Sequence, residues 1–562
     1  MNYGIVSLMI IRWAFRVGVA ILAALAMSCQ SVKIPPGTIT SEIYDPQPER
    51  PLASQQAELL DYEELVVLLK QKDVPTQAAD KAQKLFRTPF VDNGEYERKG
   101  LPSPTQHPEL GPAIRVTSWN IEKSIYVKEV AEGLRSESRF REHLKEEVNK
   151  NRRVLEDTLR QRNDLAHSDI LLLQEMDIGH PRSDYLFAAD YLAKALGMNY
   201  AYAPQQLEID PVYLGQEDVD FGNKALIDEA YRVEVSDQHK YHGVFGVAVL
   251  SRYPIKKVQA FQLKTQTYDW YEGEIERPDF VENGRRWGAR FFFEVEPVRE
   301  VKYGGRGFTR VDLHVPNVPH ETVSVINVHL EIKSTPEKRT MQIREILQYI
   351  KGISNPVILA GDFNSAATDV SSTSLYRFTQ SKLSDPTTLF SFGLWLANIT
   401  GVNQVRGLLN ATKNYQDPLA WDVPVLFTNK TKDLFNEIER FRFDDGGAFD
   451  FRGDAQRSVR GIEGVLSNSN QHSRFKGYTQ TFKLPRPIGP LGRERLDWVF
   501  VKSFLTHPQD SDGTYRLAPH YGETLSLINE SVTQPYSDHH PITTILPLKD
   551  PENSYSLHAL SR

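Results

Sequence analysis

Short apolar runs separated by charged stretches recur along most of the chain. Such a run, bounded by turn residues, is typical of a strand that is buried on both faces. The pattern predicts strands over 114–119, 170–173, 244–250, 290–296, 322–329, 356–360 and 496–501. Apolar residues at helical spacing predict helices over 57–69 and 338–350, and one long amphipathic helix over 128–165.

Many strands with fewer helices favour an α/β fold in which two packed β-sheets are flanked by helices. This rhythm is interrupted at about 365–492 by an aromatic-rich piece, a Gly/Asp-rich piece and a Pro/Gly string, which indicate a large insertion. The predicted organisation is an export signal over 1–29, a tether with a short helical extension over 30–112, a main domain over 113–548 and a tail over 549–562.

The N-terminus has the features of an export signal. Arg12 and Arg16 precede an apolar stretch over 17–27, which is short for a membrane span and ends in small residues. Cys29 follows and is the only cysteine of the chain, so this end resembles the lipid-attachment site of bacterial lipoproteins, although Ala26 stands where leucine is expected. An exported lipoprotein facing the periplasm or exterior is predicted. An ordinary cleaved signal, or an uncleaved anchor that includes 5–15, is the alternative.

Composition narrows the choice of partners. Hydrophobic residues make up 40% and charged residues 25% of the 562 residues, as in ordinary globular proteins. The formal net charge of −7 weakens the case for binding along a nucleic-acid backbone without excluding it. A single cysteine allows no disulfide within the chain, so packing must stabilise the fold.

Acids, amides and histidines stand at the ends of the apolar runs. They occur in Ser-Trp-Asn-Ile-Glu at 118–122, Leu-Gln-Glu at 173–175, Asn-Val-His-Leu at 327–330, Gly-Asp-Phe-Asn at 361–364, Arg-Leu-Asp-Trp at 495–498 and Ser-Asp-His-His-Pro at 537–541. Each motif alone is explained by a turn, a cap or a surface histidine. Their conjunction predicts metal-assisted hydrolysis of phosphate esters, which needs oxygen ligands for a divalent ion and histidines for proton transfer.

These motifs, in this order, resemble those of the endonuclease/exonuclease/phosphatase superfamily over roughly 114–548 apart from the insertion. The resemblance implies a four-layer α/β sandwich and a hydrolase that uses Mg²⁺, or Mn²⁺ or Ca²⁺. It also implies that Asn120 and Glu175 hold the cation, with Asp538 contributing from the far side. Glu122 stands where some members carry a second acid, and it is either a further ligand or merely polar.

The resemblance implies roles in proton transfer as well. Asp362 would orient or deprotonate the attacking water, and Asn364 would fix the nucleophile or a phosphate oxygen. His329 would donate a hydrogen bond to the phosphoryl oxygens. His539 would act as acid or base, with Asp497 accepting its other ring proton. Whether Asp362 or His539 is the base stays open.

The substrate class stays open too. A nucleic acid, a phospholipid or a small phosphate ester would suit this chemistry, and no protein partner is predicted. Aromatic and leucine residues over 390–396 would form either a membrane-dipping wedge, as in a sphingomyelinase-like or phosphoinositide-hydrolysing enzyme, or the core of the insertion. A catalytically silent binding module is the remaining alternative, and the presence of every expected site residue argues against it.

Overall fold

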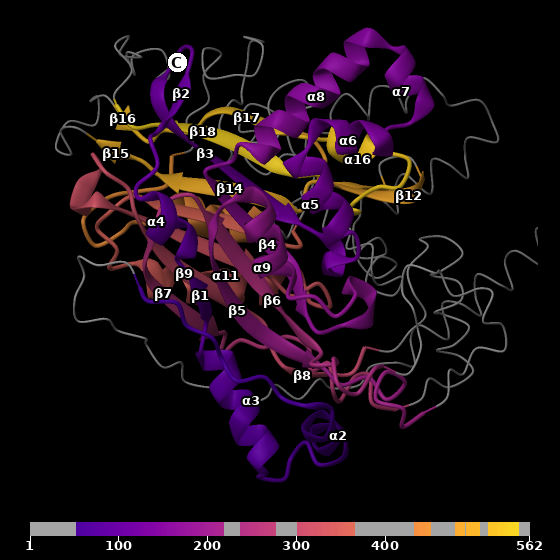
Figure 1. Cartoon of the computed structure of the whole chain (residues 1–562). Helices are drawn as coiled ribbons and strands as arrows, with labels where there is room; N and C mark the ends of the chain where they lie inside the picture. Colours follow the sequence, from indigo (N-terminus) through magenta and orange to yellow (C-terminus); the bar gives the residue numbers. More distant parts are fainter. Residues whose placement is uncertain are drawn as a thin grey trace, which may run out of the picture.

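The structure is a computed structural model, and it describes residues 52–217, 236–276, 300–365, 432–450, 478–488, 491–505 and 515–549. Two β-sheets share an apolar layer, and helices cover their outer faces (Figure 1). Both sheets are mixed, because each combines a parallel strand pair with antiparallel neighbours. This arrangement confirms the four-layer α/β sandwich predicted from the sequence.

The first sheet is the larger one. Its main path runs β1 (Phe90–Asp92), β5 (Asn199–Glu208), β6 (Val244–Ser251), β4 (Ile170–Ile178), β3 (Gly111–Asn120), β18 (Ile542–Pro547) and β17 (His520–Thr524). Outside this path, β2 (Thr105–His107) pairs with β3, and β8 (Lys302–Gly304) pairs with β5.

The second sheet has the order β14 (Asp497–Lys502), β11 (Val357–Asp362), β10 (Thr322–His329), β9 (Gly307–His314) and β7 (Ile255–Gln262). Two small strand pairs lie outside the two sheets: β12 (Phe482–Ile488) with β13 (Leu491–Glu494), and β15 (Phe504–Leu505) with β16 (Tyr515–Arg516).

The layer between the sheets is built from the predicted apolar runs. Val116, Leu172 and Val249 of the first sheet share a buried cluster with Val325 and Ile358 of the second. Burying an aliphatic side chain of this size stabilises the fold by roughly 1.5–3 kcal/mol relative to leaving it exposed. Within the described residues every predicted strand range coincides with an observed strand; 290–296 lies outside them.

Helices cover both outer faces. On the first sheet, Leu192 of α9 (Ala188–Leu196) belongs to the same buried cluster as Leu173 of β4. On the second, Ile343 of α11 (Pro336–Ile350) and Phe435 of α15 (Lys432–Arg440) pack in one cluster with Leu359 of β11. The predicted helix over 338–350 corresponds to α11. The short helix α16 (Leu527–Glu530) precedes the histidine motif near the C-terminal end.

The single long helix predicted over 128–165 is wrong. This segment forms α5 (Val127–Arg135), α6 (Glu137–His143), α7 (Glu146–Lys150) and α8 (Arg152–Ala166). Ser136 and Asn151 have extended backbone, and their side chains accept hydrogen bonds from the first turns of α6 and α8. Apolar residues keep helical spacing across these breaks, so periodicity misses them. The two capping side chains were the available signal.

The segment expected as a tether and extension over 30–112 packs on the sheets from residue 52 onward. β1 pairs antiparallel with β5, and the backbone N–H of Leu52 donates to the carbonyl oxygen of Ile255 at 2.8 Å. The helices α2 (Tyr62–Lys70) and α3 (Gln77–Arg87), at the lower end of Figure 1, bury Leu65 and Phe86 in the cluster on the first sheet. Their apolar faces therefore pack the helical extension onto the first sheet, whereas residues 30–51 lie outside the described residues.

Much of the insertion predicted at about 365–492 lies outside the described residues, including 390–396. Its described parts belong to the domain, because α15 packs on the second sheet and Phe482 forms a β-bridge with His539. Cys29 and the apolar stretch over 17–27 also lie outside the described residues. In the part of the chain that is described, no helix has the length and apolar character needed to cross a bilayer.

Candidate active site

Strand register brings the polar ends of the apolar runs together. In the second sheet His329 of β10 lies opposite Asp362 of β11, and Asp362 lies opposite Asp497 of β14. In the first sheet Asn120, the last residue of β3, lies opposite the residue that precedes Glu175 in β4. Residues expected to carry the chemistry are thus placed at one rim of the sandwich by two independent sets of strand pairs.

A buried amide pair links the two sheets directly beneath this rim. Gln174 Nε2 of the first sheet donates to Asn327 Oδ1 of the second at 2.7 Å. Asn327 Nδ2 donates in turn to the carbonyl oxygens of Ala248 (2.8 Å) and Leu173 (3.0 Å). Both amides belong to recognised motifs, but their contact connects residues far apart in the chain, and sequence reasoning gave them no role. Glu175 directly follows Gln174, and His329 stands two residues after Asn327, so the pair joins the two sheets next to both site residues.

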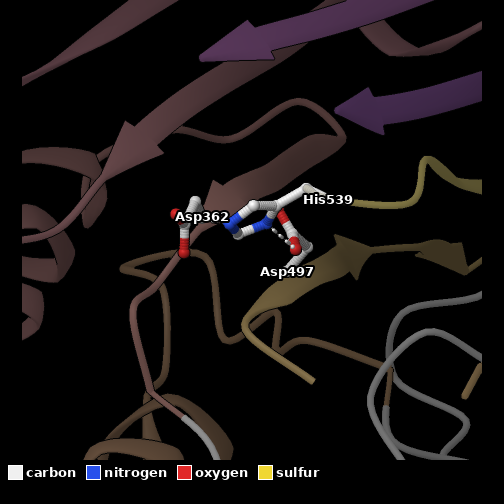
Figure 2. Close-up of side chains that lie close together, drawn as sticks. All are labelled: Asp362, Asp497 and His539. Atoms are coloured by element: carbon white, nitrogen blue, oxygen red, sulfur yellow. Dashed lines mark hydrogen bonds and ion pairs between the residues drawn. The ribbon is translucent and has the colours of Figure 1, made fainter. Parts of the chain in front are cut away.

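His539 lies between two carboxylates (Figure 2). Its Nδ1 donates to Asp497 Oδ2 at 2.8 Å, and its Nε2 is 3.9 Å from Asp362 Oδ2. Its backbone carbonyl accepts from Trp119 Nε1 (2.8 Å) and from Asn529 Nδ2 (2.7 Å), so the loop that carries the ring is anchored on two sides. The imidazole is therefore oriented with Nε2 toward Asp362.

The charges around this ring shift both groups. Burial by itself lowers the pKa of His539, but the carboxylates of Asp497 and Asp538 outweigh it and hold the pKa well above its ordinary value. Burial raises the pKa of Asp362 to about 7, with Asp497 adding to the rise and His539 opposing it. An acid and a base with such shifted pKa values, side by side in a buried site, are typical of proton-transfer chemistry.

Four oxygen-bearing side chains form the neighbouring part of the site. Asn120 Nδ2 donates to Asp362 Oδ2 at 3.1 Å, and Asn120 Oδ1 accepts from the backbone N–H of Glu122 at 3.0 Å. Glu122 Oε2 accepts from the backbone N–H of Asp538 (2.9 Å), and Glu175 Oε2 accepts from the backbone N–H of Lys123 (3.1 Å). These contacts place Asn120, Glu122, Glu175 and Asp538 in one group.

The carboxylates of this group repel one another. Burial, followed by the negative charges of Asp538 and Glu175, raises the pKa of Glu122 well above its ordinary value. Burial raises the pKa of Asp538 to about 6, with Glu175 adding to the rise and His539 opposing it. A divalent cation would relieve this repulsion, and carboxylate and amide oxygens are the donors that Mg²⁺, Mn²⁺ and Ca²⁺ prefer. The residues expected to hold a metal therefore fit one.

Backbone conformation marks the same residues. Glu122, Glu175 and Asn364 have φ of 46°, 60° and 46°, a left-handed region that non-glycine residues seldom adopt. Glu175 lies where the pairing of β4 with β6 shifts register between Leu173 and Met176. Such a bulge re-aims a side chain that regular pleating would turn elsewhere, and strain of this kind collects at functional sites.

Asp362, Asp497 and His539 also bring one ligand-type atom each within 4.8 Å of one another. Asp497 Oδ2 and His539 Nδ1 are already joined by a hydrogen bond, which favours proton transfer over metal binding for this trio. Asn364 fixes the Asp362 carboxylate, because its backbone N–H donates to Asp362 Oδ1 (2.7 Å). Its own side chain is fixed in turn, since Nδ2 donates to the carbonyl oxygen of Leu330 (2.9 Å).

His329 contacts a residue that sequence reasoning missed. Its Nδ1 accepts from Arg306 Nη1 at 2.9 Å, and its Nε2 lies 3.6 Å from Asp362 Oδ2 and 3.7 Å from Glu175 Oε1. Burial, together with the positive charges of Arg306 and of nearby groups, holds the pKa of His329 well below its ordinary value. Arg306 lies before β9 and outside every recognised motif, so no local signal connected it to the site.

A comparison of the sequence with models of known protein families identifies the family of this chain. The family model for the endonuclease/exonuclease/phosphatase family matches residues 117–539, which include every residue placed at the rim. The chain belongs to this family, whose members are in general hydrolases of phosphate esters and typically use divalent metals. No curated protein matches the chain.

Solved structures similar to the chain include an endonuclease/exonuclease/phosphatase from Beutenbergia cavernae, which is 15% identical in sequence. The match covers 78% of this chain and 72% of that chain, with a TM-score of 0.35. A family protein from Leptotrichia buccalis has 12% identity, 77% and 99% coverage and a TM-score of 0.33. The catalytic domain of human Nocturnin has 13% identity, 78% and 95% coverage and a TM-score of 0.31.

Proposed function

We propose that this protein is a divalent-metal-dependent hydrolase of phosphate esters that acts on phosphodiesters. The observation that carries the proposal is the adjacency of two groups at one rim: a hydrogen-bonded Asp497–His539 pair facing Asp362, and an oxygen-only group of Asn120, Glu175 and Asp538. The first moves protons, and the second suits a hard cation.

Asn120, Glu175 and Asp538, with Glu122 beside them, would hold the metal. The bound metal supplies positive charge that polarises a phosphoryl oxygen. Asp362, oriented by Asn120 and Asn364, holds the attacking water and is placed to receive its proton at Oδ2.

The two histidines act on the other oxygens. His539 Nδ1 is committed to Asp497, so Nε2 is the atom that exchanges a proton with the reacting group. His329 Nε2 faces the same space between Asp362 and Glu175, where it can donate to a phosphoryl oxygen as charge develops there.

The test is a hydrolysis assay of the full chain with Mg²⁺, and with EDTA, on DNA, sphingomyelin, phosphoinositides and a generic bis-aryl phosphodiester. Turnover of at least one class that is lost with EDTA and in His539→Ala is expected. The class that is turned over identifies the substrate branch. A folded protein that binds no Mg²⁺ and turns over none of these would instead support the silent binding module.

We also propose that the protein is exported and acts outside the cytoplasm, held at a membrane through lipidated Cys29. The basic residues, apolar stretch and lone cysteine of the N-terminus support this proposal. About twenty residues rich in Pro, Ser and Thr separate Cys29 from the packed domain that begins at residue 52, which is enough chain to hold the domain clear of a bilayer surface.

A further inference from the structure

The Nδ1 atoms of the two site histidines have hydrogen-bond partners of opposite kind, an acceptor for His539 and a donor for His329. His539 Nδ1 faces the carboxylate of Asp497, which can only accept a hydrogen bond when ionised. His329 Nδ1 faces the guanidinium of Arg306 at 2.9 Å, and a guanidinium can only donate. Since the same ring nitrogen meets an acceptor in one histidine and a donor in the other, the two rings cannot serve the same purpose.

Donor chemistry fixes where the proton of His329 resides. Arg306 Nη1–H occupies the direction of the Nδ1 lone pair, so Nδ1 carries no proton and the ring N–H is at Nε2. Nε2 points to the space between Asp362 and Glu175. The His329 side chain is only 1% exposed, so the Arg306 contact at Nδ1 is shielded from bulk solvent.

Arg306 is itself held on several sides. Its Nε donates to Glu331 Oε2 at 3.1 Å, and the same oxygen accepts from Trp270 Nε1 at 2.9 Å. Its backbone N–H donates to Gln266 Oε1 (2.9 Å), and its carbonyl oxygen accepts from Gln266 Nε2 (2.8 Å). A guanidinium with its backbone and its Nε both anchored is preorganised to present Nη1 to His329.

We propose that Arg306 is a positioning residue that fixes His329 as a dedicated hydrogen-bond donor through Nε2, so that of the two histidines only His539 exchanges a proton with the reacting group. This inference rests on the proposed function and divides the work of its two histidines. A donor aimed at the phosphoryl oxygens stabilises charge in the transition state without changing protonation. Protonating Nδ1 of His329 would require Arg306 to leave, so the ring does not take up the proton of the attacking water.

The first test needs no substrate. The full chain is labelled with histidine carrying ¹⁵N at Nδ1 in one sample and at Nε2 in another, and the signal of His329 is assigned by its absence in His329→Asn. An unprotonated Nδ1 and a protonated Nε2 are expected for wild-type His329. A proton on Nδ1 of the wild-type protein overturns the proposal. This result stands even if every substrate of the assay panel fails, so it separates this inference from the proposed function.

The second test measures the role of Arg306 in turnover of the bis-aryl phosphodiester. Arg306→Ala is expected to lower kcat about 10- to 100-fold with little change in KM, because supporting residues around a site commonly carry effects of this size. Guanidinium added to the assay should restore part of the loss by refilling the cavity.

The matched control is Arg310→Ala, which removes an ion-paired arginine of β9 whose guanidinium binds Asp312 at 2.8 and 2.9 Å. It should leave kcat unchanged and show no response to guanidinium. Wild-type kcat in Arg306→Ala, or a folded Arg306→Ala variant that guanidinium leaves unchanged, overturns the positioning role.

Discussion

Replacing Asn327 with leucine should destabilise the protein more than any exposed substitution, because this side chain joins the two sheets. Asn327 has no exposed surface, and it makes three hydrogen bonds, to Gln174 Nε2 and to the carbonyl oxygens of Leu173 and Ala248. A buried hydrogen bond contributes about 1 kcal/mol net, so the variant should lose about 3 kcal/mol of unfolding free energy.

The double variant Asn327→Leu/Gln174→Met tests whether the pair is the cause. If the amides stabilise each other, removing both leaves neither amide without its partner, and the double variant should lose at least about 1 kcal/mol less than the two single variants together. The assay is urea unfolding followed by intrinsic fluorescence, with an unchanged m value showing that the same transition is compared.

Thr309→Val is the matched control. Thr309 lies directly opposite Asn327 in the β9–β10 pair and is equally buried, and its hydroxyl has no hydrogen-bond partner among the described residues. Its replacement by valine should leave the unfolding free energy unchanged or raise it, because no hydrogen bond is lost and a buried hydroxyl without a partner is removed. The reasoning is refuted if Asn327→Leu changes stability no more than Thr309→Val does.

The remaining predictions concern the site and the anchor. Glu175→Gln should weaken Mg²⁺ binding, measured by calorimetry, at least about tenfold, whereas Asp497→Asn should leave the affinity near that of the wild type. The reverse result would assign the metal site to Asp362, Asp497 and His539 instead. His539→Gln should lower kcat by about 10²–10⁴ with an unchanged circular dichroism spectrum, and wild-type turnover would remove His539 from the mechanism. Cys29→Ala should release the protein from sedimented membranes, whereas a variant that still sediments would indicate a transmembrane anchor.

Much of the fold was predictable from the sequence because its signals are local. A strand buried on both faces must be apolar along its length, so the runs at 170–173 and 322–329 identified β4 and β10 without knowledge of their neighbours. The polar residues that meet at the rim could also be named in advance, since motifs at strand ends keep carboxylates and histidines next to those runs. The order and register of the strands then bring these residues together at one rim.

The tertiary structure decided what depends on partners distant in the chain. The Gln174–Asn327 link spans 153 residues, and the packing of α2 and α3 on the first sheet depends on surfaces formed by later strands. Arg306 stands 23 residues before His329, and the antiparallel pairing of β9 with β10 brings the two together. Hydrogen-bond partners are set by where chains meet in space, so only the folded structure shows which nitrogen of each histidine meets a donor and which meets an acceptor.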